Sequence, residues 1–351
     1  MIKQIKVAVI GAGIAGLSCA TALKNARFQV TVFEKSRGVS GRLSTRVTEQ
    51  WQCDHGAQYF TARDPLFYSE VERWLDAKVA QLWEPILKEF DHNTFSPKEN
   101  EKASKTIRYV GYPKNNSPAK WLAQTLNVLT ESTVSSIHKQ ENQWQVSTKE
   151  HGVYADNFDL LILAIPAPQA TVLLNNTKSS LASLCAGITM QPCFALMIQF
   201  NQKINCQFDG LFINAGLLSW AARDSAKPGR SQGNLSQGET WVLHATSQWS
   251  KAHVGDEKDT VAQLMLEEFT NILRFDGCLN AYGKVAIAPQ SYNLHRWLYA
   301  DCERYLTDVY KFDTEQKIGL CGDWLNGGKV QGAWLSGLKL AHELIRNNQH
   351  L

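Results

Sequence analysis

Three glycines near the start of the chain constrain its fold more than any other feature. Gly11, Gly13 and Gly16 follow the pattern G-x-G-x-x-G, between an apolar β-branched run at residues 5–10 and a helix-like segment at residues 14–26. The first glycine permits a tight turn, the second lets backbone approach a pyrophosphate, and the third lets the helix pack on the strand. This order predicts a strand, a turn and a helix that bind a dinucleotide.

An acidic residue favours this interpretation over a glycine-rich turn that binds no ligand. Glu34 ends the next apolar strand, 18 residues after Gly16, where its carboxylate can accept hydrogen bonds from ribose hydroxyls. The helix contributes its first amides, among them those of Ile14 and Ala15, and the positive end of its dipole. With the adjacent Lys35, these residues form the predicted site for one half of a dinucleotide.

Two further segments favour FAD over NAD. Gly41 and Arg42 form a second glycine-rich turn just beyond Glu34, and the arginine can bind a pyrophosphate through two parallel hydrogen bonds. Near the other end of the chain, Gly322 and Asp323 follow an apolar strand, where an aspartate can hold a ribityl hydroxyl. Amides that open the next helix can point at the pyrimidine edge of a flavin, and the residues predicted there are Val330, Gly332 and Ala333.

Composition and charge exclude several classes of function. The 351 residues are 44% hydrophobic and 20% charged, with a net charge of +3, so we expect a globular protein that binds no nucleic acid. Beyond the amino-terminal stretch, no segment approaches the roughly 18 to 20 apolar residues of a membrane span. The glycines interrupt that stretch as they would not in a signal peptide, so we expect a cytoplasmic protein. Eight scattered cysteines predict buried free thiols and no metal site.

The order of segments predicts an α/β fold with two parts. One is a Rossmann-like FAD-binding domain of the two-dinucleotide-binding type, and the other is an inserted α+β substrate domain built on an antiparallel sheet. Since both chain ends carry predicted FAD contacts, the FAD domain comprises residues 1–65, 114–170 and 300–351. The substrate domain comprises residues 66–113 and 171–299. Within it, the Gly-, Ser- and Gln-rich segment 226–239 is expected to be an exposed loop.

Several segments together resemble one enzyme family. They are residues 11–34, Gly41-Arg42, the run Asp54-His55-Gly56-Ala57-Gln58-Tyr59-Phe60, residues 108–113, 158–166 and 322–337, and the run His295-Arg296-Trp297. This set resembles the FAD-binding family that includes the amine oxidases, and most closely its renalase-like bacterial branch. The resemblance spans nearly the whole chain, with one departure at Ser40, where many relatives have glycine.

The resemblance implies non-covalent FAD and further contacts to it. By this resemblance, Val134 contacts the adenine through its backbone. Gly56 and Ala57 are small enough to let backbone approach a flat ring closely, and we include them in the cofactor site with their neighbours Gln58 and Tyr59. Ordinary packing is the alternative role for Tyr59.

Aromatic and basic residues in the family-like segments are candidates to contact the substrate. The residues predicted there are Phe60, Tyr109, His244, Arg296, Trp297 and Trp324. Arg296 has two open interpretations, a contact to a substrate phosphate and an internal salt bridge. His244 and His295 have the chemistry for proton transfer, and the alternative for each, as for His55, is a structural role. No catalytic side chain is assigned, because the flavin itself carries the chemistry.

Three classes of function remain open. Renalase-like enzymes oxidise isomeric dihydronicotinamide dinucleotides, which are reduced at the wrong ring carbon, to NAD(P)+, and dioxygen then reoxidises the flavin to give hydrogen peroxide. We favour this reaction because such a ring loses hydride without a base, and no Ser-His-Asp or metal constellation stands out. An amine oxidase of the same superfamily is the alternative, with Lys284 or another lysine assisting through a water. The third class is a flavin-binding protein that is not an enzyme.

Overall fold

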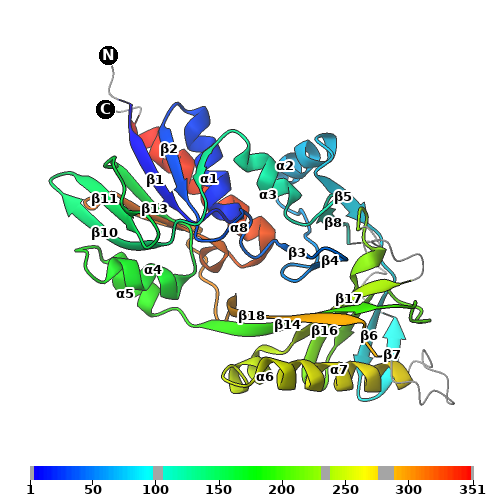
Figure 1. The fold of residues 1–351 in the computed structure, drawn as a ribbon. Helices are drawn as coiled ribbons and strands as arrows, with labels where there is room; N and C mark the ends of the chain where they lie inside the picture. Colours follow the sequence, from blue (N-terminus) through cyan, green and yellow to red (C-terminus); the bar gives the residue numbers. More distant parts are fainter. Residues whose placement is uncertain (1–3, 98–105, 231–237, 276–287, 349–351) are drawn as a thin grey trace.

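A mostly parallel sheet of six strands, drawn from both ends and the middle of the chain, forms one of two large sheets (Figure 1). The computed structural model describes residues 4–97, 106–230, 238–275 and 288–348. Every neighbouring pair in this sheet is parallel except the pair at one edge, where β19 runs antiparallel to β20. The order across this parallel sheet is β19 (Tyr310–Asp313), β20 (Ile318–Cys321), β13 (Leu160–Leu163), β1 (Lys6–Ile10), β2 (Gln29–Phe33) and β9 (Asn127–Leu129).

Different elements cover the two faces of the parallel sheet. One face packs against α1 (Ile14–Asn25) and α8 (Lys329–Asn348), which share one apolar core with it. These helices approach closely, since a Cβ on Gly337 would lie 2.0 Å from the carbonyl oxygen of Ala15. The other face packs against a small antiparallel sheet through Phe33 and Phe158. The strands of the small sheet are β10 (Val134–Gln140), β11 (Gln143–Thr148) and β12 (Gly152–Val153).

A second large sheet has seven strands, and helices back one of its faces (Figure 1). Its neighbours are antiparallel except β15 and β6, so we name it the antiparallel sheet. The backing helices are α6 (Ser247–Ala252) and α7 (Lys258–Phe275). The strand order is β18 (Ser291–Cys302), β14 (Met190–Phe200), β17 (Glu239–Ala245), β16 (Leu218–Arg223), β15 (Gly210–Ile213), β6 (Leu87–Asp91) and β7 (Thr94–Pro97).

A short hairpin lies between the two large sheets (Figure 1). It consists of β3 (Thr45–Val47) and β4 (Gln52–Asp54), and it faces the side of the antiparallel sheet that carries no helices. Beside it lie α2, β5, β8 and α3, and α4 and α5 lie near the small sheet. Their bounds are Pro65–Asp76, Ala80–Trp83, Arg108–Gly111, Ser117–Ala123, Ala167–Leu174 and Leu181–Ala186.

The structure differs from two expectations, one about residues 66–113 and one about residues 226–239. Helix α2 packs through Phe67 and Trp74 into the same core as α1 and α8, although the sequence places residues 66–113 in the substrate domain. The expectation of an exposed loop at residues 226–239 is wrong for the first part of that segment, because Lys227 and Arg230 are buried. Their charges are paired in the interior, which is why a polar segment can be buried. Residues 231–237 of that loop lie outside the described residues.

Two further features concern cysteines and membrane spans. The seven described cysteines are free, as predicted, and all but Cys193 are buried. No helix in the described ranges combines the length and apolar character needed to cross a membrane.

Candidate flavin and substrate site

The glycine-rich turn fits a bound pyrophosphate. Gly11 has a φ of +104°, and a Cβ on Gly16 would lie 2.0 Å from the Gly11 carbonyl oxygen, so both positions require glycine. A Cβ on Gly13, in contrast, would meet no atom within 4 Å. No side chain caps the amino terminus of α1, and its first turn holds no acidic residue. An open backbone next to uncapped helix amides is what a diphosphate requires.

Glu34 is held at the end of β2 by backbone amides. Its carboxylate accepts hydrogen bonds from the amides of Ala12 and Ser36, each at 2.8 Å. Each oxygen keeps a further lone pair, so the predicted contact to a ribose hydroxyl fits this geometry. Val134 begins β10 shortly after Ser132, whose amide donates to the Glu34 carbonyl. The predicted adenine contact thus lies near the predicted ribose contact, and Lys35 is exposed beside them.

The two ends of the chain meet through Arg42 and Asp323. The Arg42 guanidinium pairs with the Asp323 carboxylate at 2.5 Å and donates to the Ala300 carbonyl at 3.0 Å. The two glycine turns also touch, because a Cβ on Gly41 would lie 3.4 Å from the Cα of Gly13. The structure therefore brings together the predicted FAD contacts from three separate segments.

The small residues after β4 pack against the backbone of the second glycine turn. A Cβ on Gly56 would lie 1.9 Å from the carbonyl oxygen of Arg42, and the Ala57 amide donates to that oxygen at 2.9 Å. Gly56 and Ala57 thus approach the backbone of the second glycine turn closely, and their approach to a flat ring stays a prediction. Tyr59 packs between Trp83 and Trp220.

At the start of α8, Gly332 also meets protein backbone. A Cβ there would lie 2.2 Å from the Asn326 carbonyl oxygen. Val330 is buried in the core shared with α1, and Ala333 packs against that core. Gly322 precedes Trp324, whose indole would collide with a Cβ on Gly322 at 2.7 Å.

Three of the predicted substrate contacts lie in the core. Trp324 is 1% exposed and its indole donates to the Ile165 carbonyl at 3.2 Å. Phe60 and Tyr109 stack on each other with ring centroids 5.9 Å apart, and Phe60 also meets Trp74 of α2. Apolar packing with α2 and the small sheet surrounds these rings, which sequence order does not reveal, and their contact to a substrate stays a prediction.

Arg296 lies on the wrong face of its strand for the predicted phosphate contact. Side chains alternate along a strand, so Arg296 points opposite to His295 and Trp297. Its guanidinium donates to the carbonyl of Val254, beyond α6, on the helix-covered side of the antiparallel sheet. His295 and Trp297 are therefore the residues of this run that face the hairpin.

A row of aromatic side chains crosses the antiparallel sheet on its open face. One register line across the sheet contains Trp220 of β16, His244 of β17, Ala195 of β14 and His295 of β18. Residues in register on neighbouring strands point to the same face. The small Ala195 separates the two histidines of the row.

His55, at the end of β4, completes this group. Its ring stacks on Trp297 with centroids 5.2 Å apart and meets His295 edge-on at 4.9 Å. The Trp297 indole donates to the His55 carbonyl at 2.8 Å. We call His55, His244, His295, Trp220 and Trp297 together the histidine face. It adjoins the second glycine turn, since His55 directly precedes Gly56, which packs on the backbone of Arg42.

The three imidazoles of the histidine face are held neutral. Burial lowers the pKa of His55 to about 3, with help from His295 and Arg46. Burial likewise lowers the pKa of His244 to about 4, assisted by Lys227, and that of His295 to about 4, assisted by Arg46. Within the described part of the chain, no group of three His, Cys, Asp or Glu side chains could hold a metal ion. The face is thus a neutral, aromatic surface.

Three ring nitrogens of the histidine face are buried without a hydrogen-bond partner among the described residues. They are His55 Nδ1, His244 Nε2 and Trp220 Nε1. Buried polar atoms are normally paired, so these nitrogens suit a ligand that offers both donors and acceptors. Sequence reasoning named His244 and Trp297 as substrate contacts, left a structural role open for His55 and His295, and omitted Trp220.

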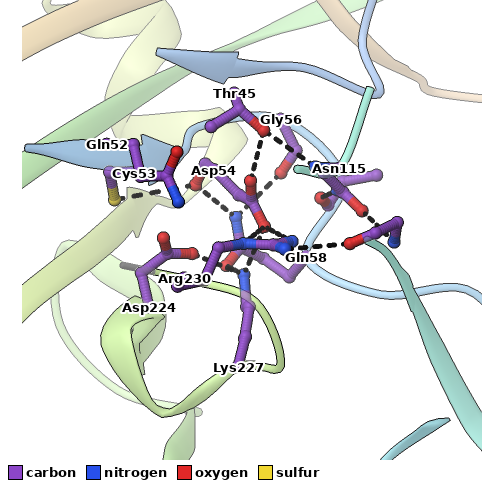
Figure 2. A network of polar contacts seen from close by, with 12 residues as sticks. Thr45, Gln52, Cys53, Asp54, Gly56, Gln58, Asn115, Asp224, Lys227 and Arg230 are labelled. Carbon is purple, nitrogen blue, oxygen red and sulfur yellow. Dashed lines mark hydrogen bonds and ion pairs between the residues drawn. The ribbon is translucent and has the colours of Figure 1, made fainter. Parts of the chain in front are cut away.

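A buried ionic network beside the histidine face was also missed (Figure 2). Asp54 pairs with Lys227 at 3.2 Å and with Arg230 at 2.5 Å, and Lys227 pairs with Asp224 at 2.8 Å. All four side chains are 0% exposed. The sequence signal was the presence of Asp54 in a family-like run, but its partners lie in a segment whose polar composition indicates a loop.

Comparison with known proteins identifies the family. A model described as "NAD(P)-binding Rossmann-like domain" matches residues 9–77. A second model, described as "Flavin containing amine oxidoreductase", matches residues 115–345, which is more than half of the chain. The chain belongs to the flavin-containing amine oxidoreductase family. Membership of this family confirms the predicted FAD and the predicted class, an oxidoreductase of the amine oxidase superfamily.

Solved structures share the fold of this family member at low identity. Cyclohexylamine oxidase from Brevibacterium oxydans IH-35A gives a TM-score of 0.71 at 11% identity, over 99% of this chain and 100% of that one. A putrescine oxidase triple mutant, redesigned in cofactor binding, gives 0.70 at 13% identity, over 98% and 99%. The predicted fold class is confirmed.

A curated relative matches a shorter stretch of this amine oxidoreductase family member. An L-amino-acid oxidase from Siganus canaliculatus is 33% identical over 91 residues, which cover 25% of this chain and 16% of the relative. The chain therefore spans a small part of that relative's length. The family model over residues 115–345 establishes the family, and the renalase-like branch stays a prediction.

Proposed function

We propose that this family member takes hydride from an isomeric dihydronicotinamide dinucleotide, 2- or 6-dihydro-NAD(P), that binds at the histidine face. Bound FAD supplies the hydride acceptor, and reoxidation by dioxygen gives hydrogen peroxide. The resemblance to the renalase-like branch supports this donor. We call the histidine face together with Arg46 the donor site.

The close packing of the His55, His295 and Trp297 rings, in a setting that keeps the imidazoles neutral, is the observation that carries the proposal. A dihydropyridine becomes an aromatic cation when it loses hydride, so no base has to keep a proton in that step. Imidazoles whose pKa values lie at about 3 and about 4 bind a proton weakly at neutral pH. Two of them, His55 and His244, each have a buried ring nitrogen without a hydrogen-bond partner among the described residues, and such a nitrogen can hydrogen-bond a neutral carboxamide such as that of nicotinamide.

Arg46 supplies a positive charge for the diphosphate of the donor. It lies on β3, and its charge depresses the pKa of both His55 and His295, so it is close to the histidine face. A dinucleotide carries a diphosphate, which a guanidinium binds well. We assign to Arg46 the phosphate contact that the sequence suggested for Arg296.

Amine oxidation is the second candidate function. The family description and the similarity to an L-amino-acid oxidase favour it. An amine must first lose a proton to expose its lone pair, and the histidine face is poorly suited to retain that proton. Lys284, suggested as an assisting base, lies outside the described residues. A flavin-binding protein without enzymatic activity is the third candidate.

Anaerobic mixing in a stopped-flow spectrometer tests these candidates. We expect rapid bleaching of the flavin band by 2- or 6-dihydro-NAD(P), and slow or absent bleaching by ordinary NAD(P)H and by amines. Bleaching by amines alone would establish the amine oxidase. Absence of bleaching by every donor, with FAD bound, would leave the flavin-binding protein.

A further inference from the structure

Gln58 fixes the backbone on both sides of His55. Its amide nitrogen Nε2 donates to the carbonyl oxygen of Asp54 at 2.9 Å and to that of Gly56 at 3.0 Å. These two residues flank His55 directly. Gln58 is 8% exposed, so both hydrogen bonds are shielded from water.

Lys227 determines which way the Gln58 amide points (Figure 2). Its Nζ donates to Gln58 Oε1 at 2.9 Å. An ammonium group is a donor only, so it selects the amide orientation in which the oxygen faces Lys227 and Nε2 faces the two carbonyls. Burial lowers the pKa of Lys227, but Asp224 and Asp54 outweigh this effect and raise it above its ordinary value. Lys227 thus remains charged.

Asp54 anchors the other end of this arrangement. Burial would raise the pKa of its carboxyl, but Lys227 and Arg230 outweigh that effect and hold it below its ordinary value. Arg230 also donates to the carbonyls of Gly111 and Pro113, each at 2.8 Å. The backbone that precedes His55 is therefore tied to two other segments of the chain.

The His55 ring has weak side-chain hydrogen bonding of its own. Its Nε2 lies 3.4 Å from Ser44 Oγ, at the long limit for a hydrogen bond, and its Nδ1 has no partner among the described residues. Stacking on Trp297 fixes the plane of the ring. The position of the His55 ring in the donor site depends on the His55 backbone, which Gln58 holds from both sides.

We propose that Gln58, oriented by Lys227, is a positioning residue that holds His55 in the donor site. Gln58 thereby acts through backbone and has no need to touch the cofactor or the donor, in contrast to the cofactor contact suggested by its sequence neighbours. The proposal rests on the proposed function, because it takes the histidine face to be the place where the donor binds.

Gln58→Met tests this role with a matched control. The substitution removes three neutral or charge-assisted hydrogen bonds and leaves the volume similar, and Gln199→Met is the control because Gln199 is a buried glutamine of β14 that bonds Ser291. We expect Gln58→Met to raise the dissociation constant of 6-dihydro-NAD by about tenfold, with little change in the limiting reduction rate. Gln199→Met should leave both values unchanged.

A second readout is independent of the donor and of enzyme turnover. In wild-type protein the His55 Cε1–H resonance, assigned by its loss in His55→Gln, should stay constant from pH 8 to 5. In Gln58→Met we expect the loosened ring to hydrate and to titrate about one unit or more closer to the ordinary pKa. Lys227→Met should give the same change if Gln58→Met does not fold.

The outcomes separate the two proposals. If Gln58→Met and Gln199→Met behave alike in both readouts, the positioning role is wrong. If dihydronicotinamides fail to reduce the wild-type flavin while Gln58→Met still changes the His55 titration, the positioning of His55 stands and the proposed donor is wrong.

Discussion

Arg46 and Arg296 are a matched pair of arginines with opposite expected effects. Arg46→Ala should raise the dissociation constant of 6-dihydro-NAD by about tenfold or more, because it removes a charged hydrogen bond to the diphosphate. Arg296→Ala should leave that constant within about twofold, because its guanidinium is used by the Val254 carbonyl behind the sheet. Rapid-mixing titrations of both variants provide the measurement, and the reverse ranking would contradict the assignment.

The case of Arg296 shows what residue patterns predict and what they miss. Gly11, Gly13 and Glu34 could be predicted because their roles are local to a turn and to the end of one strand. The face that Arg296 occupies depends on the register of β18 with β14, which is set by contacts distant in sequence. The same holds for His55 and His295, whose rings meet only after folding.

The buried histidines also predict how stability depends on pH. Their folded-state pKa values lie below the ordinary 6.5, so below that pH the unfolded chain binds more protons. The stabilisation is complete above pH 6.5 and is lost as the pH falls towards about 4. For His55 alone, the free energy of unfolding should fall by roughly 1 kcal/mol per pH unit between pH 6 and 5.

Urea denaturation at several pH values measures this slope. His55→Gln should reduce it, whereas replacing the exposed His138 by Gln should leave it unchanged. Equal slopes in wild type and His55→Gln would show that His55 is not held neutral by burial.

At the scale of elements, two glycines distinguish cofactor binding from packing. Gly13→Val places a side chain where no protein atom lies within 4 Å, so we expect normal stability and loss of FAD retention. Gly337→Ala places a Cβ 2.0 Å from the Ala15 carbonyl, so we expect lower stability of the α1 and α8 packing. Absorbance of bound flavin and the thermal midpoint measure the two effects, and Gly13→Val with full flavin content would contradict the pyrophosphate assignment.

Hydrophobic periodicity predicts those helices and strands whose own sequence shows an apolar pattern and a clear boundary. The strand, turn and helix at the amino terminus are recovered because β1 is apolar and buried after its first residue, Lys6, and the glycines end it. The packing partner of α2 could not be predicted, since its apolar face fits either part of the molecule until Phe67 and Trp74 meet the core of α1 and α8. Burial of Lys227 was likewise hidden, because only one of its two acidic partners, Asp224, is local, and the other, Asp54, lies 173 positions away.

At the scale of the whole molecule, the proposed donor site lies where the two large sheets meet the β3–β4 hairpin. The parallel sheet carries the loops that fit FAD, the antiparallel sheet carries His244 and His295, and the β3–β4 hairpin links them through His55 (Figure 1). The hairpin thus lies between a layer proposed to bind the cofactor and a layer proposed to bind the substrate. We expect hydride to pass from a donor at the antiparallel sheet to FAD at the parallel sheet.

Product stoichiometry in a single anaerobic turnover tests that claim most directly. One equivalent of 6-dihydro-NAD is mixed with FAD-loaded protein without oxygen, and the flavin absorbance and the NAD+ formed are both measured. The account predicts one NAD+ for each flavin bleached, and one hydrogen peroxide for each flavin after air is admitted. An oxidised flavin with the donor unconsumed, or bleaching without NAD+, would contradict it.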